Sequence, residues 1–337
     1  MQQLTKSVAL LPFLGVLVLA SFGLDLSFGS EQIPFSKILE TLGRDPGQQW
    51  IDQIVWNMRL PRSIAAVTGG ALLAVAGLLL QVYFQNPIVG PFVLGVSSGA
   101  SLMVALVTLT TLFLGYMHIS PYITSIAALL GSLAIMSLVI AIAAKIKSPV
   151  ILLIIGLMIG YITRSITGGI IAFAEAERLR GFVLWEMGSF AGITWQEVRI
   201  MVVGGVLLLA GAYGLSKSLN AFLLGENYAA TMGINIKRFR LFIVFISCGL
   251  ASLVTATAGP VSFIGLAVPH IARLLLNTSN HLLLIPATAL LGAAITGICD
   301  LIAKMAFAPV EIPVSGVTCL IGAPIVIRLL LKRIARP

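Results

Sequence analysis

The sequence predicts an all-α polytopic membrane protein, and three observations lead to this class. Of its 337 residues, 58% are hydrophobic and 10% are charged, and the mean hydropathy is +1.06. Soluble domains carry about 25% charged residues, so this chain has too few polar side chains to cover a soluble surface. Apolar runs of about 18 or more residues recur along the chain, and each can cross a bilayer as a helix.

Ten apolar runs are the predicted spans, numbered here in chain order. They are Val8–Phe28, Ser63–Tyr83, Phe92–Leu114, Tyr122–Ala144, Val150–Phe173, Val198–Leu215, Leu241–Ala258, Val261–Leu276, Leu282–Ala303 and Val314–Leu331. The first run resembles a signal peptide, but it continues past Ser21 without a small-x-small cleavage site, and we interpret it as a retained span. Polar stretches separate the spans at residues 29–58, 175–197 and 217–240.

The basic residues predict how the chain is oriented. With the N-terminus in the cytoplasm, basic clusters fall inside at residues 145–147, 217–240 and 332–336, and they contain almost no acids. This agrees with the positive-inside rule, and an even number of spans places both termini on that side. The net charge of +9 is therefore attributed to the membrane topology and not to nucleic-acid binding.

The stretch RLPR, at residues 59–62, falls outside at the start of the second span. Arg59 and Arg62 are three residues apart and share a face if the segment is helical, and Pro61 suits a first helical turn. The residues alone leave two interpretations open. The arginines are either an anchor to lipid headgroups or a contact for a protein partner.

Two joints between spans resemble each other. Asn86–Gly95 (NPIVGPFVLG) joins spans two and three, and Thr257–His270 (TAGPVSFIGLAVPH) joins spans seven and eight. Each contains Gly-Pro followed shortly by another glycine. The topology places the first joint on the cytoplasmic side and the second outside. Broken helices at matching places in two halves are expected of an inverted repeat.

At this point the chain resembles the FecCD-type permeases, the membrane subunits of ATP-binding-cassette importers for iron chelates, haem and vitamin B12. The matching stretches are Met58–Ala100, Leu224–Arg240, Gly259–Leu275 and Glu311–Leu331, in family order. The resemblance implies a single permease domain over residues 1–337, with half-repeats at about 59–173 and 241–331 and a coupling segment at about 217–240. Its fold is expected to be similar to that of the vitamin B12 permease.

The resemblance also implies partners in the bacterial inner membrane. They are a second copy of the chain, two ATP-binding-cassette ATPase subunits in the cytoplasm, and an external substrate-binding protein. The motif G-x-x-x-x-G-K-[ST] is missing from this sequence, so ATP hydrolysis is expected on a partner, with no catalytic residue, metal or cofactor on this chain. The lipid bilayer is the remaining partner.

Three groups of site residues follow from the resemblance. Docking of the external protein is expected at Arg59, Arg62 and Lys304, where a permease of the family has arginine in the third position. Coupling to the ATPase is expected at Leu224, Glu226, Ala229, Ala230 and Gly233. The cytoplasmic gate is expected at Asn86, Pro87, Ile88, Val89, Gly90 and Pro91, and, by position alone, at Lys147, Ser148 and Pro149.

Span five carries a charge inside an apolar run. Gly156, Gly160, Arg164 and Gly168 recur every four residues, so they share one helix face. Because an unpaired charge near mid-membrane costs about 2.5 kcal/mol or more, Arg164 needs water or a partner. A water-filled pathway lined by this face meets that need. The alternatives are a pair with a carboxylate such as Asp300, or an arginine that reaches outward to the membrane surface.

Other functions remain as alternatives. An importer of the same family could move an oxyanion such as molybdate. An ion-coupled secondary transporter would need several buried carboxylates, and the spans offer Asp300 as the candidate. An intramembrane enzyme would need a His/Asp/Glu cluster or a Ser–His pair, whereas His270 stands alone in the sequence pattern. Cys248, Cys299 and Cys319 lie far apart in apolar runs and are interpreted as buried thiols.

Overall fold

The structure is a computed structural model that describes residues 2–29, 31, 33–43, 50–110, 121–146 and 148–334, and no strand occurs among these residues. The first elements are α1 (Gln2–Ser27), α2 (Phe35–Leu42), α3 (Trp50–Ile54), the π-helix η1 (Val55–Arg59), α4 (Leu60–Tyr83), the 3₁₀-helix η2 (Pro91–Leu94), α5 (Val96–Leu109), α6 (Pro121–Ala143) and α7 (Pro149–Ala172). Then follow α8 (Ala176–Glu186), α9 (Trp195–Gly214), α10 (Ser216–Phe222), α11 (Glu226–Thr231), α12 (Ile236–Ala258), α13 (Ile264–Leu276), α14 (His281–Met305) and α15 (Val314–Ile334). The predicted all-α class is confirmed.

Helices occupy all ten predicted span positions, but not all are long. In the described part of the chain, seven helices are long and apolar enough to cross a membrane, and three apolar helices are shorter. The short ones are Val96–Leu109, Ile264–Leu276 and Val314–Arg328, at the third, eighth and tenth predicted spans. At about 1.5 Å per residue, α5 and α13 reach about 20 Å, which is less than the roughly 30 Å hydrocarbon layer.

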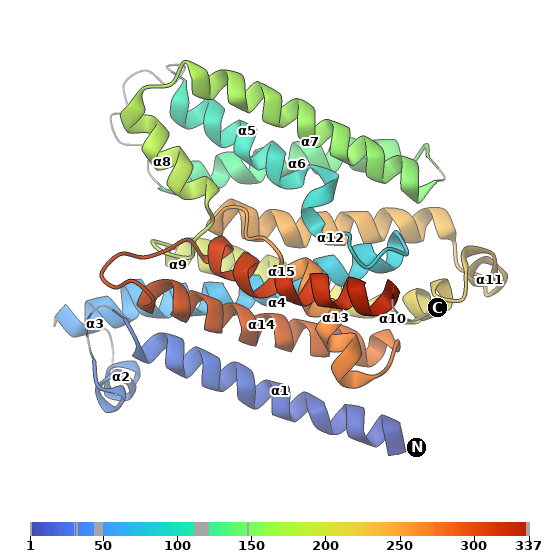
Figure 1. The fold of residues 1–337 in the computed structure, drawn as a ribbon, viewed down its shortest axis with the longest axis horizontal. Coiled ribbons are helices and arrows are strands. Elements are labelled where there is room, and N and C mark those ends of the chain that lie inside the picture. The colour runs from blue at the N-terminus through green and yellow to red at the C-terminus, as the bar shows by residue number, and fades with distance from the viewer. Residues whose placement is uncertain are drawn as a thin grey trace.

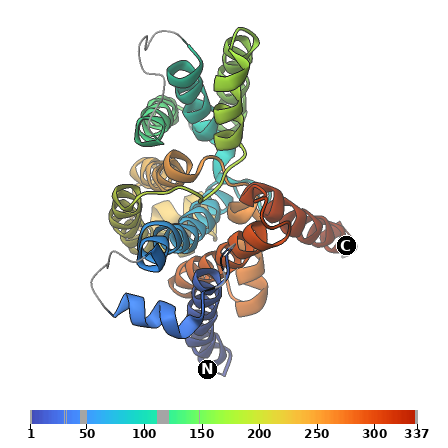
Figure 2. The same ribbon diagram turned by 90° about the vertical axis from the view of Figure 1, so that its left-hand side faces the viewer.

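The long helices run side by side across the molecule (Figure 1). Helices α2, α3 and α8 lie at one end, here called the α8 end, and α10 and α11 lie at the other, the α11 end. The start of α1 and the end of α15 both lie at the α11 end, as an even number of spans requires. Figure 2 shows α5, α6 and α7 in a layer on the opposite side of the molecule from α1.

Helix α4 forms the centre of the core, and glycines let its neighbours approach closely. A Cβ on Gly70 would lie 2.3 Å from the carbonyl oxygen of Gly292 in α14. Seven residues later on α4, a Cβ on Gly77 would lie 1.7 Å from the carbonyl oxygen of Gly265 in α13. Small residues at such crossings are the usual means by which membrane helices pack tightly.

The start of the second span differs from the prediction. Helical structure runs without a loop from Trp50 to Tyr83, a length of 34 residues, whereas the hydropathy pattern placed the start at Ser63. Pro61 is near the start of α4, as expected, but the π-helix η1 leads directly into it. Proline has no N–H to donate, and a local π turn is one way in which membrane helices accommodate it. RLPR therefore lies within a helix and not at a helix entrance.

The two Gly-Pro joints meet inside the molecule. Helix α5 runs from its joint toward the α8 end, and α13 runs from its joint toward the α11 end (Figure 1). These opposite directions are what an inverted repeat requires. The expected positions on two opposite surfaces need correction, because a Cβ on Gly265 would lie 2.6 Å from Cδ of Pro91. Each joint starts at its own end but turns inward, so both short helices begin at mid-depth.

Candidate functional site

Arg62 is held by two carboxylates from distant parts of the chain. Its Nε lies 2.9 Å from Oδ2 of Asp300, and its Nη2 lies 3.1 Å from Oδ1 of the same residue. Its Nη1 donates to both carboxylate oxygens of Glu311, at 2.9 and 2.7 Å. Paired N–H groups on one carboxylate form a strong, oriented contact. Arg62 is 8% exposed, so its charge is satisfied inside the protein.

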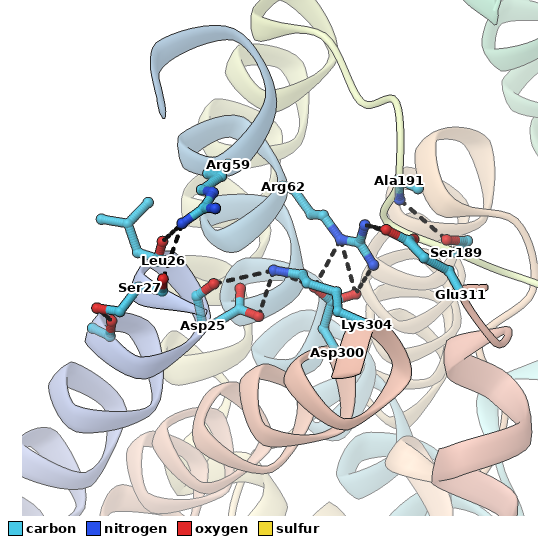
Figure 3. Close-up of polar contacts among 11 residues, drawn as sticks. Asp25, Leu26, Ser27, Arg59, Arg62, Ser189, Ala191, Asp300, Lys304 and Glu311 are labelled. Carbon is cyan, nitrogen blue, oxygen red and sulfur yellow. Dashed lines mark hydrogen bonds and ion pairs between the residues drawn. The ribbon is translucent and has the colours of Figure 1, made fainter. Parts of the chain in front are cut away.

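Lys304, one turn after Asp300 on α14, extends this group. Its Nζ lies 2.6 Å from Oδ1 of Asp25 in α1 and 3.1 Å from Oδ2 of Asp300. Both aspartates are fully buried. We call Asp25, Arg62, Asp300, Lys304 and Glu311 the ion-pair cluster (Figure 3). It ties α1, α4 and α14 to the loop before α15.

Arg59 has a different role from Arg62, three residues away. Its Nη1 donates to the carbonyl oxygens of Leu26 and Ser27, at 3.1 and 2.9 Å, and its Nη2 donates to that of Glu31. The last carbonyls of a helix lack partners within the helix and attract cations, so Arg59 caps the end of α1. Figure 3 shows the two arginines directed to opposite sides. The two side chains therefore do not share one face, contrary to the expectation for a helical segment.

The three predicted docking residues thus come together at the α8 end, but their charges are engaged within the chain. Sequence reasoning missed Asp25 and Glu311 as partners. Asp25 was detectable, because an acid inside an apolar span needs a partner. Glu311 opens the last family-like stretch but lies outside every predicted span. The alternative pair of Arg164 with Asp300 is wrong, since Asp300 is shared by Arg62 and Lys304.

The predicted pathway face lies on α7. A small cavity of about 100 Å³ is lined by Gly156, Gly160 and Arg164 together with residues of the first joint and α5, among them Phe92, Val93 and Ser98. Gly156 allows close packing, because a Cβ there would lie 3.0 Å from Cα of Leu94. Gly168 lies away from this cavity, and a Cβ added to it would meet no atom within 4 Å.

Arg164 itself is exposed on the surface of the single chain. Among the residues that the structure describes, it forms no hydrogen bond or ion pair. Large apolar side chains surround it on α7, including Tyr161 at 64% and Ile162 at 61% exposure. An arginine in such a surface requires water or a further partner.

The predicted gate loop is a compact turn. The side-chain oxygen of Asn86 accepts a hydrogen bond of 3.0 Å from the backbone N–H of Ile88. Val89, Gly90 and Pro91 are buried, and Ile88 is exposed. In the second gate segment, Ser148 caps α7, and Pro149 is its first residue. Lys147 lies outside the described residues.

The predicted coupling segment contains α11. Gly225 and Gly233 bound this helix with φ of 111° and 85°, a conformation that favours glycine. Nη2 of Arg240 lies 2.6 Å from Oε2 of Glu226, which fastens α11 to α12. Leu224 and Ala230 are exposed, but Ala229 is fully buried and is not available to a partner. The expectation that both alanines offer close approach is therefore corrected to Ala230.

Three further observations concern a large cavity, possible metal ligands and the cysteines. A cavity of about 940 Å³ is lined mainly by α1 and the segment that follows it, including Leu19, Leu24 and Phe28, together with Met305 at the end of α14. Within the described part of the chain, no group of three or more His, Cys, Asp or Glu side chains could hold a metal ion. The three cysteines are free thiols, and Cys248 and Cys299 are buried.

Comparison with known proteins gives a consistent result. Residues 16–332 match the FecCD transport family. The vitamin B12 import system permease protein BtuC of Salmonella paratyphi A and of Salmonella typhi is 33% identical over 331 residues, which cover 98% of this chain and 97% of that protein.

Solved structures extend the comparison. One is described as a metal-chelate type ABC transporter in an inward-facing conformation. It is 29% identical, with a TM-score of 0.83 over 96% of this chain and 99% of that chain. PsaBC from Streptococcus pneumoniae in complex with Fab shares the fold alone, at 14% identity and a TM-score of 0.51 over 87% of this chain and 94% of that chain.

Proposed function

Because the chain belongs to the FecCD transport family, we propose that it is the permease subunit of an ABC importer that moves a metal chelate across the bacterial inner membrane. The observation that carries this proposal is the full-length match, which leaves no large part of this chain or of its relatives unaccounted for. The cargo class is ferric siderophore, haem or cobalamin. The names of the relatives make cobalamin the first cargo to test.

The α11 end is assigned to the cytoplasm, because the coupling segment and the described residues of the basic clusters lie there. Two ATPase subunits would bind there. Leu224, Tyr228 and Met232 support this, since they expose 68%, 48% and 61% of their surface beside Ala230. An exposed apolar patch rimmed by polar residues is typical of a protein interface. The gate loop of residues 86–91 lies at this end, between α4 and the start of α5.

The face of α7 around Arg164 is assigned to a second copy of the chain. Lipid would cover the apolar side chains but would leave the guanidinium group unpaired, at a cost of about 2.5 kcal/mol or more. A water-filled pathway between two copies hydrates Arg164 and also covers the apolar neighbours. Gly156, Gly160 and Arg164 would then line this pathway, and the small cavity beside α5 would open into it.

The α8 end is assigned to the outside, where the external substrate-binding protein would dock near Arg59, Arg62 and Lys304. Since Arg59 is buried against the carbonyls of α1, we assign it a supporting role. Charge reversal at Arg62 would add a third carboxylate beside Asp300 and Glu311, and it would disturb the fold as well as docking. Docking must therefore be tested with milder changes.

Reconstitution tests the proposal. The chain, its ATPase partner and the external protein are assembled in vesicles, and ATP-driven uptake is measured with cyanocobalamin, haemin, a ferric hydroxamate and molybdate. We expect uptake of one metal chelate and no ATP hydrolysis by the purified chain alone. Uptake of molybdate alone would support the oxyanion alternative, and hydrolysis by the isolated chain would overturn the assignment as a permease subunit.

An ion-coupled transporter gains one argument, because Asp25 and Glu197 are buried carboxylates in addition to Asp300. Glu197 accepts hydrogen bonds from the hydroxyls of Ser125 and Thr194. Both aspartates, however, are paired with Lys304, and Asp300 also with Arg62. A carboxylate that carries an ion must exchange its partner during transport, whereas these two are compensated. Uptake that persists without ATP and follows an imposed ion gradient would favour this alternative.

A further inference from the structure

One carboxylate of the ion-pair cluster, Glu311, is not needed to balance the charges of the buried residues. Asp25, Asp300, Arg62 and Lys304 are nearly or fully buried, and their two negative and two positive charges balance. Glu311 is the fifth member, and 39% of its side chain is exposed. Removal of Glu311 therefore leaves a neutral buried core, in contrast to removal of either aspartate.

Glu311 lies where the cluster opens to solvent. It belongs to the loop of residues 306–313, in which Phe307 and Val310 are 67% and 66% exposed. The loop is fixed at its end by two backbone hydrogen bonds, Ile312 N–H to Ala303 O and Val314 N–H to Gly188 O, both of 3.1 Å. Figure 3 shows Glu311 on the side of Arg62 that faces away from Asp300.

The N–H groups of Arg62 form hydrogen bonds to two different carboxylates. Nε and Nη2 point into the protein at Asp300, whereas Nη1 points at Glu311. An external carboxylate that approaches Arg62 would reach Nη1 first, and it would find the position taken. Arg62 keeps its contact with Asp300 while the carboxylate at Nη1 is exchanged, so the buried guanidinium is paired throughout.

We propose that Glu311 is a built-in competitor that occupies, between docking events, the position on Arg62 that a carboxylate of the external binding protein takes. This inference rests on the proposed function. Docking then requires the displacement of Glu311, which weakens the association and keeps it reversible. Arg62 stays paired with Asp300 in either state, and Glu311 occupies only Nη1 when no partner is bound. Arg62 thus serves the fold through its contact with Asp300 and the docking through Nη1.

The test compares Glu311→Gln and Glu311→Ala with the unchanged importer, reconstituted with its ATPase partner. The probe is the external binding protein that supports uptake, and its dissociation constant is measured at low ionic strength. Without a charged competitor, we expect binding to tighten by about two- to fivefold, the size of one partly exposed ion pair. The matched control is Glu177→Gln, which removes an exposed carboxylate of α8 at the same end of the molecule.

A second measurement reports the displacement itself. Hydrogen exchange of the Ile312 amide is compared with and without the bound external protein. We expect faster exchange in the bound state of the unchanged chain, and faster exchange in Glu311→Ala even without a partner. Melting temperatures check that both variants are folded.

The possible results distinguish a failure of the inference about Glu311 from a failure of the proposed function. Equal or weaker binding by both Glu311 variants, or tightening that also occurs in Glu177→Gln, would overturn the competition between Glu311 and the external carboxylate while leaving the importer assignment intact. No binding of an external protein to the unchanged importer would contradict the proposed function, and the competition with it.

Discussion

Arg62 and Arg164 are both arginines in membrane helices, but their surroundings differ completely. Arg62 lies in α4, is 8% exposed, and meets Asp300 and Glu311. Arg164 lies in α7, is exposed, and forms no hydrogen bond or ion pair with any residue that the structure describes. Carboxylates of the same chain neutralise the charge of Arg62, whereas none of the described residues does so for Arg164. Two arginines in apolar helices are thus distinguished by their burial and their partners, which the pattern of apolar residues does not reveal.

The strongest test of this contrast is the loss of a buried partner. Asp300→Ala would leave Arg62 and Lys304 without their shared carboxylate, and breaking a buried pair costs about 3–5 kcal/mol. We expect little folded protein, measured as the monodisperse fraction after extraction and as the melting temperature. Arg164→Ala serves as the matched control and should be folded. Two variants of equal stability would contradict the view that only one of these charges is structural.

The glycines of the same two helices sharpen the comparison. Gly77→Ala would place a methyl group 1.7 Å from the carbonyl oxygen of Gly265, and such overpacking costs about 1–3 kcal/mol or more. Gly168→Ala on α7 meets no atom within 4 Å and should be neutral or slightly stabilising. Thermal unfolding of the two variants in one detergent measures the difference. A destabilised Gly168→Ala would mean that the α7 face is already packed.

The α11 end offers a similar contrast between a buried and an exposed position, in the adjacent residues Ala229 and Ala230. Ala229→Trp forces a large side chain into the buried side of α11, and we expect a loss of stability of about 1–3 kcal/mol. Ala230→Trp lies on the exposed side, so it should leave the melting temperature unchanged while ATP hydrolysis becomes uncoupled from uptake. Unfolding curves and the ratio of transported cargo to hydrolysed ATP separate the two effects. Normal coupling in a folded Ala230→Trp would reduce α11 to a connector.

The last prediction concerns Arg164, where the expected effects on stability and on uptake are both small. Arg164→Ala should change the free energy of unfolding by no more than about 0.5 kcal/mol, as for an exposed position. Uptake in the reconstituted importer should fall a few-fold, on the scale of about one exposed charge contact. Arg164→Lys keeps the charge and should restore most of the uptake. Full activity of the alanine variant would remove Arg164 from the pathway.

The helical positions were predictable because their signals are local. Hydropathy identifies apolar runs from neighbouring residues alone, and Gly-Pro pairs such as Gly90–Pro91 and Gly259–Pro260 mark the broken joints. The inward turn of these joints was not predictable. It depends on the contact between Pro91 and Gly265, which lie in different halves of the sequence.

The candidate site was only partly predictable, for a related reason. The motif RLPR identified Arg59 and Arg62, but Arg62 and Asp300 are 238 residues apart, and no local pattern states which carboxylate an arginine will meet. The role of Arg59 depends on where α1 ends. The burial of Ala229 instead of Ala230 depends on the rotation of a six-residue helix, which two identical small side chains do not determine.

The contact between Asp25 and Lys304 has a consequence for the order in which the protein is made. The two residues are 279 positions apart. At a synthesis rate of about 5–20 residues per second, the ribosome reaches Lys304 roughly 15–60 seconds after it has passed Asp25. Through that interval the first span carries its carboxylate without the lysine that finally neutralises it. The ion pair that joins α1 to α14 can therefore form only near the end of translation, after α14 has been made.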